Sequence, residues 1–266
     1  MKRQRLNWQE KVRKNVRKIM DFEHVKAVFE EYLNGYDREN DKVKLKIVHT
    51  YGVIRCSEEI GRRMGLQAED MELAKLIALL HDIGRFEQLK RFNSFEADTM
   101  DHATYGVQVL FEEGMIRQFI EEDTWDDVIR TAIAKHSDYE LTGITDERTL
   151  LHARLIRDAD KLDNCRVKLE DAMETLLDLS ADEVGKYAIS PKVREDAFAG
   201  KCICSKDRRT PMDYWVSYVA YFYDLNFRET LEYVKRIIGR VPYTNEQTKK
   251  TMEELERQLT EYVRRK

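Results

Sequence analysis

The chain has 266 residues, 36% of them charged, and its formal net charge of −4 argues against a protein that binds polyanions through its whole surface. Only three prolines and eleven glycines interrupt a sequence rich in helix-forming residues, so we predict an all-α fold. No apolar run approaches the ~18 residues that cross a bilayer, and no signal peptide is recognisable, so we expect a cytoplasmic protein with no membrane partner.

The first 19 residues depart from this balance of charge. They contain one acid, Glu10, and eight basic residues: Lys2, Arg3, Arg5, Lys11, Arg13, Lys14, Arg17 and Lys18. We expect a solvated first helix here. The alternative is a tether to RNA or to an acidic partner, and nucleic acid is otherwise not an expected partner.

Three segments predict the first three large helices. Residues 22–33 carry apolar side chains at spacings of three and four and end at Asn34-Gly35, a typical helix stop. Residues 43–64 repeat this pattern, carry His49 and end at Gly65, a second helix stop. Residues 71–82 are apolar on nearly every side, so we expect a central, buried helix that closes with His81-Asp82.

The middle of the chain predicts a loop followed by two helices. Residues 85–101 lack a sustained period and indicate a long loop over a site. A helix is expected to begin near His102. Thr124 and Asp127 resemble a capping box for the next helix, which ends on His136.

The final part of the chain predicts further helices. Residues 150–177 form one of them, with Asp160 and Asp163 on its inward-facing stripe. Thr210-Pro211-Met212-Asp213 combines an N-cap, a proline at the first helical position and an acid at the third, so a helix begins here. The aromatic stripe that follows is expected to be core packing and not a ligand site: Tyr214, Trp215, Tyr218, Tyr221, Phe222 and Leu225. One helix then runs to Gly239, and a charged final helix covers residues 245–264.

Four histidines and two aspartates lie on inward-facing stripes or at the ends of different predicted helices: His49, His81, Asp82, His102, His136 and Asp160. A buried carboxylate is costly unless it is paired or binds a cation. Neutral imidazoles and carboxylates together are the ligands of a borderline divalent metal ion. The pattern therefore predicts a metal site, whereas His24 and His152 are expected to be structural.

In the order of these residues the chain resembles the HD-domain superfamily of metal-dependent phosphohydrolases. The ordered histidine, adjacent His-Asp pair and later aspartate of the family are His49, His81-Asp82 and Asp160 here. Two further histidines, His102 and His136, mark the branch with two metals. The second of these stands alone, unlike the paired histidines of the cyclic-dinucleotide phosphodiesterase branch.

The resemblance covers about residues 43–168, roughly half of the chain. It implies an HD-domain helical bundle with a C-terminal helical extension. We therefore expect residues 1–266 to form a single domain, in which the metal-binding core spans about 43–168 and the extension about 178–266.

The resemblance also implies a role for each ligand. The first metal ion would be held by His49, His81, Asp82 and Asp160, and the second by His102 and His136, with Asp82 as the bridge. The two divalent ions could be Fe, Mn, Zn, Ni or Mg. A water that they share would be acidified and would attack the phosphorus atom as a metal-bound hydroxide.

Three more residues are candidates for catalysis beside Asp82. Arg85 stands where the family often has lysine, and its guanidinium could bind two phosphate oxygens, although a surface salt bridge is the alternative. Lys161 and Asp163 could orient metal-bound water or the imidazoles. Their alternative is a structural ion pair.

The expected function is hydrolysis of a phosphate ester of a nucleotide or another small phosphorylated metabolite, by a phosphomonoesterase or phosphodiesterase. The segments 85–101 and 137–149 should form the rim of the pocket. One alternative is a di-iron oxygenase that uses the same ligand set. Another is a non-catalytic nucleotide-binding module, although such modules usually lose ligands and this chain keeps all six. A homo-oligomer is compatible with all three readings.

Overall fold

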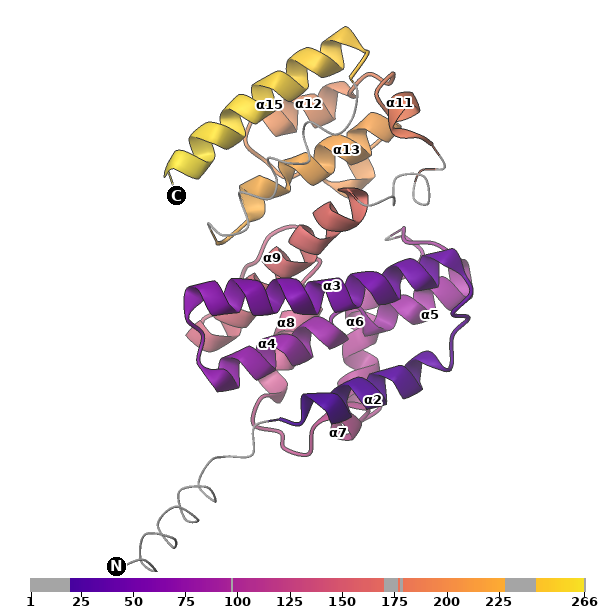
Figure 1. Ribbon diagram of the computed structural model, residues 1–266, viewed down its shortest axis with the longest axis vertical. Coiled ribbons are helices and arrows are strands. Elements are labelled where there is room, and N and C mark those ends of the chain that lie inside the picture. Colours follow the sequence, from indigo (N-terminus) through magenta and orange to yellow (C-terminus); the bar gives the residue numbers. More distant parts are fainter. Residues whose placement is uncertain (1–19, 97, 170–176, 178, 228–242, 266) are drawn as a thin grey trace, which may run out of the picture.

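The computed structural model describes residues 20–96, 98–169, 177, 179–227 and 243–265 (Figure 1). This part of the chain is helical and contains no strand, which confirms the all-α prediction. The basic segment 1–19 and the helix expected up to Gly239 lie outside the described residues. No helix in the described part is long and apolar enough to cross a membrane.

The N-terminal bundle consists of the helices up to residue 169. They are α2 (Phe22–Leu33), α3 (Asp41–Met64), α4 (Ala68–Leu80), α5 (Ile83–Phe92), α6 (His102–Val107), the π-helical turn η1 (Gln108–Glu112), α7 (Ile116–Phe119), α8 (Asp126–Lys135) and α9 (Glu147–Leu169). The central contacts are those of α3 with α4 and α9, and of α8 with α9. Their apolar faces enclose one continuous core that includes Phe29, Leu76 and Ile133.

The C-terminal bundle consists of the described elements after residue 179. They are α11 (Ala181–Val184), α12 (Pro191–Phe198), the 3-10 turn η2 (Ser205–Asp207), α13 (Pro211–Val219), the 3-10 turn η3 (Ala220–Asp224) and α15 (Glu246–Arg265). They enclose a second core around Trp215 and Phe222, which also includes Cys165 of α9. Figure 1 shows α9 rising from the N-terminal bundle towards the C-terminal one.

Local signals explain where several helices begin and end. The side chain of Asn40 accepts hydrogen bonds from the backbone N–H groups of Lys42 and Val43 at the start of α3. At the other end, Gly65 adopts a left-handed conformation with φ of 73°, as the sequence predicted. The reciprocal capping box of Thr210 and Asp213 at the start of α13 is also confirmed.

Two local predictions were wrong. Residues 83–92 form helix α5, where the sequence predicted a loop, because Ile83, Phe86 and Leu89 bury one narrow stripe that charged neighbours obscure. Asn93, with φ of 45°, ends this helix. The capping box at Thr124 is absent, since α8 begins after Trp125 and has no side-chain cap.

A close approach of two helices shapes the centre of the N-terminal bundle. Gly84 of α5 packs so tightly on α6 that a Cβ atom there would lie 2.2 Å from the carbonyl oxygen of His102. The N-cap Asp101 holds the start of α6, because its side chain accepts hydrogen bonds from two backbone N–H groups. This contact brings His102 next to the turn that carries Asp82.

Candidate metal centre and adjoining pocket

The structure brings the six predicted ligands together from five different places in the N-terminal bundle. They are His49 on α3, His81 and Asp82 between α4 and α5, His102 at the start of α6, His136 directly after α8, and Asp160 on α9. The four imidazoles are buried. The ring centroids of His81 and His136 are 5.2 Å apart, and those of His102 and His136 are 5.0 Å apart.

Asp82 lies between two pairs of histidines. Its Oδ1 atom is 3.1 Å from Nε2 of His102 and 3.6 Å from Nε2 of His136. Its Oδ2 atom is 3.3 Å from Nε2 of His81 and 3.9 Å from Nε2 of His49. Each carboxylate oxygen therefore faces a different pair of imidazoles, which is the arrangement that a bridging ligand needs.

Asp160 completes the side of the site that contains His49. Its Oδ1 atom lies 2.9 Å from Nε2 of His49 and 3.7 Å from Nε2 of His81. Two groups of three side chains have donor atoms close enough together to hold a metal ion: His49, His81 and Asp160, and His81, Asp82 and His136.

Hydrogen bonds on the far side of the rings orient three of the histidines. Nδ1 of His81 and Nδ1 of His136 lie 2.8 and 2.7 Å from the backbone carbonyl oxygen three residues earlier in the chain. Nδ1 of His49 lies 2.7 Å from Oδ2 of Asp163. Since carbonyl and carboxylate oxygens accept, Nδ1 donates, and when the ring is neutral the lone pair of Nε2 faces the site.

Cationic groups lie next to the carboxylates of the metal-free site. Burial lowers the pKa of His81, but the carboxylates of Asp82 and Asp160 outweigh it and raise the pKa to about 9. Burial also raises the pKa of Asp82, yet Lys46 and His81 hold that pKa well below its usual range. Lys46 forms an ion pair with Oδ2 of Asp82. Cationic side chains thus neutralise the carboxylates at the place where a metal ion would do so.

Two buried polar atoms at the centre make no hydrogen bond with any described residue. They are Nε2 of His81 and Oδ1 of Asp82. A buried polar atom without a partner is costly, and coordination to a cation removes that cost. The donor set of imidazole nitrogens and carboxylate oxygens therefore fits a borderline divalent metal ion.

Arg85 lines this site and does not form a surface salt bridge. Its Nη2 atom donates to Nε2 of His102 at 2.9 Å, and its Nη1 atom donates to the carbonyl oxygen of Phe95 at 3.2 Å and to the side chain of Gln88. Its buried Nε atom has no hydrogen-bond partner among the described residues and lies 3.8 Å from Oδ1 of Asp82. A metal ion on Nε2 of His102 would have to displace the hydrogen bond from Arg85.

The remaining candidates separate into two kinds. Asp163 is fully buried and contacts His49, one of the expected ligands. Lys161 instead points to the C-terminal bundle, where its Nζ atom lies 2.7 Å from Asp224. Among the described residues Lys161 contacts none of the expected ligands, so its role in orienting them stays a prediction, and its side chain lines the pocket described below.

The two histidines expected to be structural lie outside the site. Nε2 of His24 is 2.9 Å from the backbone oxygen of Gln118. Nε2 of His152 is 3.0 Å from Oδ1 of Asp70. Both rings thus have partners elsewhere in the N-terminal bundle.

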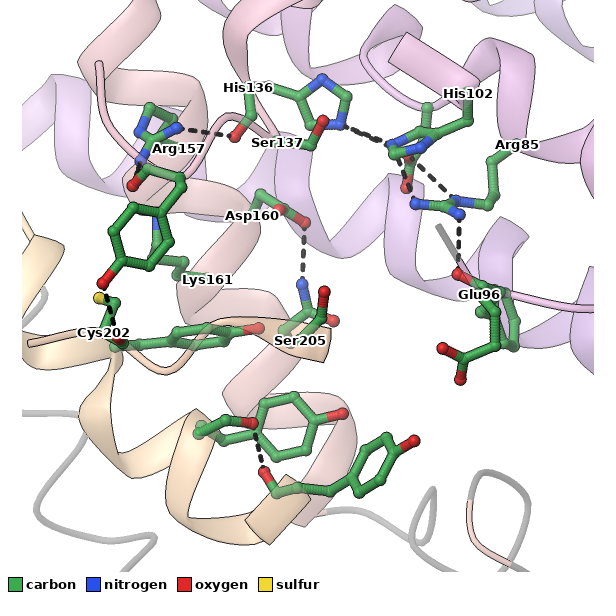
Figure 2. Close-up of a pocket in the computed structure, with 18 of the residues that line it drawn as sticks. Arg85, Glu96, His102, His136, Ser137, Arg157, Asp160, Lys161, Cys202 and Ser205 are labelled. Atoms are coloured by element: carbon green, nitrogen blue, oxygen red, sulfur yellow. Dashed lines mark hydrogen bonds and ion pairs between the residues drawn. The ribbon is translucent and has the colours of Figure 1, made fainter. Parts of the chain in front are cut away.

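A pocket of about 650 Å³ adjoins the candidate metal centre and is lined by both bundles (Figure 2). The N-terminal bundle contributes the metal-binding groups on one side, and Figure 2 shows Cys202 and Ser205 of the C-terminal bundle across from His136 and His102. Both expected rim segments, 85–101 and 137–149, supply lining residues.

The prediction for the aromatic stripe was half wrong. Trp215 and Phe222 are core residues of the C-terminal bundle, as expected. Tyr214, Tyr218 and Tyr221 instead line the pocket. Helical spacing places residues on faces of a helix but does not say whether a face meets a core or a cavity, and the phenol hydroxyls were the unused signal.

Two further pocket residues escaped the sequence analysis. Lys46 lies one turn before His49 on α3, and Asn164 lies one turn after Asp160 on α9, where its Nδ2 atom donates to Oδ1 of Asp160 at 3.0 Å. The spacing of three or four residues from a predicted ligand could have found both of them.

Comparison with known proteins agrees with this geometry. Residues 47–165 match the family model of the HD domain, which confirms the resemblance seen in the sequence. The chain is also 30% identical over 165 residues to Ribonuclease Y of Acetivibrio thermocellus, a match that covers 59% of this chain and 27% of that protein. The chain thus spans about a quarter of the length of this curated relative. No solved structure matches the chain.

Proposed function

We propose that this chain, which carries an HD domain of the metal-dependent phosphohydrolase superfamily over residues 47–165, hydrolyses a phosphate ester of a small phosphorylated metabolite such as a nucleotide. One observation carries the proposal. Asp82 is shared by two pairs of imidazoles at the wall of a pocket of about 650 Å³, a volume suited to a small molecule.

The chain's own residues provide the binding chemistry. Divalent ions held by the six ligands supply, when bound, an acidified water and positive charge for the phosphoryl oxygens. Arg85 and Lys46 line the same side of the pocket as Asp82 and are placed to bind phosphate oxygens. Asp163 keeps the ring of His49 in the tautomer that binds metal, because its carboxylate accepts the Nδ1 proton.

A phosphodiester is the second candidate substrate, and one observation favours it. The chain is similar to Ribonuclease Y over 165 residues, and the name of that protein denotes cleavage of RNA. The pocket volume of about 650 Å³ favours the smaller substrate. A nucleic-acid tether in residues 1–19 stays the alternative to a solvated first helix, and a cytoplasmic location stays a prediction.

Metal analysis combined with substrate screening tests the proposal. Purified protein loaded with Mg²⁺, Mn²⁺ or Zn²⁺ should release phosphate from at least one nucleoside monophosphate or sugar phosphate, and the Asp82→Ala variant should not. Cleavage of a short RNA without phosphate release from any monoester would favour the phosphodiesterase. Oxygen consumption by the iron-loaded protein, with no hydrolysis under any metal, would contradict the proposal and favour the di-iron oxygenase.

A further inference from the structure

The part of the pocket wall that the C-terminal bundle contributes contains a cation whose role the hydrolytic site does not explain. Arg208 lies between η2 and α13 and lines the pocket together with Tyr214, Tyr218 and Tyr221. It belongs to the C-terminal bundle, whereas Arg85 and Lys46 belong to the N-terminal bundle. Both bundles thus contribute cations to the pocket.

Arg208 is held in place by neutral groups. Its guanidinium carbon lies 4.3 Å from the centroid of the Tyr214 ring, within the range of a cation–π contact. Its Nε atom donates to the backbone oxygen of Ser205 at 3.1 Å. The two terminal nitrogens make no hydrogen bond with any residue that the structure describes. These contacts orient the side chain, while its two terminal nitrogens remain available to donate hydrogen bonds to a ligand.

The other cationic side chains of the pocket already have acidic partners. Lys46 and Arg85 lie within ion-pair distance of Asp82, and Arg157 and Lys161 lie within ion-pair distance of Asp224. No described carboxylate lies within that distance of Arg208. Glu96 and Asp101 line the pocket, but neither is an ion-pair partner of Arg208.

We propose that Arg208 forms a second anion subsite, so that the substrate carries a phosphate or carboxylate group in addition to the ester that is cleaved. A guanidinium with both terminal nitrogens available binds such a group through two parallel hydrogen bonds. The inference rests on the proposed function for the placement of the cleaved ester at the metal centre. It goes further by specifying that the substrate has two anionic groups.

A length series of simple probes tests this subsite. For chains of four, six and eight carbons, three compounds are compared by calorimetry on the metal-loaded protein: the ω-hydroxyalkyl phosphate, the alkanediol bisphosphate and the ω-phosphooxy carboxylate. At one length, a second anion should tighten binding roughly ten- to hundred-fold, as expected for charged hydrogen bonds. A gain from the bisphosphate alone identifies a phosphate subsite, and a gain from the carboxylate identifies a carboxylate subsite.

Two variants complete the design. Arg208→Gln should abolish the gain in affinity that the second anion gives. It should leave the affinity for the hydroxyalkyl phosphate, which has one anion, unchanged. Arg209→Gln is the matched control, since Arg209 is exposed, does not line the pocket and bonds through its Nη1 atom to the backbone oxygens of Lys206 and Arg208. This variant should keep the gain.

The outcomes separate this inference from the proposed function. The proposed subsite is refuted if the gain in affinity persists in Arg208→Gln, or if no chain length shows a gain, even when phosphate esters are hydrolysed. A gain that depends on Arg208 while no phosphate ester is hydrolysed leaves the subsite standing and contradicts the proposed function. Unfolding of Arg208→Gln would appear as a lower melting temperature, and Arg208→Lys, which keeps the charge but loses the fork, should then show a reduced gain.

Discussion

The carboxylate of Asp163 on α9 lies 2.7 Å from Nδ1 of His49 on α3, and it occupies space that only a glycine at position 52 leaves free. The contact joins the two long helices of the N-terminal bundle at the candidate metal centre. It also determines which nitrogen of His49 carries the proton, because a carboxylate accepts but does not donate. Packing and ligand orientation therefore depend on the same pair of residues.

Replacement of Asp163 should weaken metal binding without removing a ligand. Asp163→Ala deletes the acceptor for Nδ1 of His49, so we expect a ten- to hundred-fold lower metal affinity, the usual effect of losing such a partner. Asp163→Asn keeps an acceptor oxygen and should lose less of the metal affinity. Competition with a chromophoric chelator measures both. Equal affinities for all three proteins would show that the ring of His49 is held by its surroundings alone.

Gly52→Ala should disturb the same contact from the other helix. A Cβ atom at position 52 would lie 1.9 Å from Oδ1 of Asp163, so the carboxylate must move away from His49. We expect a loss of about 1–3 kcal/mol in the free energy of unfolding, as for other overpacked sites. Denaturant titration measures the loss, and metal affinity should fall with it.

Gly61→Ala is the matched control on the same helix. A Cβ atom there meets only the ends of the flexible side chains of Leu66 and Met71, at 2.9 Å. These ends can shift, and alanine is the better helix former, so the stability should stay within about 1 kcal/mol of the wild type. If both variants lost the same stability, the clash with Asp163 would not be the cause.

Much of the fold was predictable because the signals were local. Helix α2 has the predicted bounds of 22–33, and the predicted stop at Gly65 is where α3 ends. Helix α5 was missed because only two residues separate it from the end of α4 and it has one narrow buried stripe. The capping box predicted at Thr124 is also absent, since α8 begins after Trp125 and its first turn has no side-chain cap.

The candidate site divides in the same way. The six expected ligands could be picked out because their residue types and order are distinctive, and the structure places them together. The place of Arg208 in the pocket wall was not foreseeable, since it depends on how the C-terminal bundle packs against the first one. No spacing along the chain records that packing.

Asp82→Ala should abolish both metal retention and hydrolysis. Each oxygen of Asp82 faces a different pair of imidazoles, so its loss removes a ligand from both sides of the site. Metal content by mass spectrometry and phosphate release measure the two effects. A variant that retains one metal ion per chain would show that the two sides bind metal independently, which contradicts the bridging role.

Arg85→Ala should weaken substrate binding or turnover and leave the metal content unchanged. Arg85 donates to Nε2 of His102 in the absence of metal, but it supplies no ligand atom of its own. Loss of a charged hydrogen-bond donor to phosphate should lower kcat/KM roughly ten- to hundred-fold. Steady-state kinetics with each hydrolysed ester measure this change. Unchanged kinetics with all of them would refute the phosphate-binding role.

The last prediction concerns how pH and metal removal act on stability. In the metal-free protein the pKa of His81 is raised from 6.5 to about 9, against the effect of burial, by Asp82 and Asp160. Protonated His81 therefore stabilises the metal-free fold fully below pH 6.5, and this stabilisation is lost as the pH rises through 9. A metal ion needs the neutral imidazole, so the affinity of the protein for metal rises over the same pH range, and acidification releases the metal.

We expect the melting temperature of the chelated protein to fall between pH 7 and 9.5, while the melting temperature of the metal-loaded protein stays constant, so that the difference between the two grows. Differential scanning calorimetry in matched buffers measures both curves. If chelated and metal-loaded protein melt at the same temperature at every pH, the apolar faces of the helices alone hold the five ligand-bearing segments together. Metal then does not stabilise the bundle.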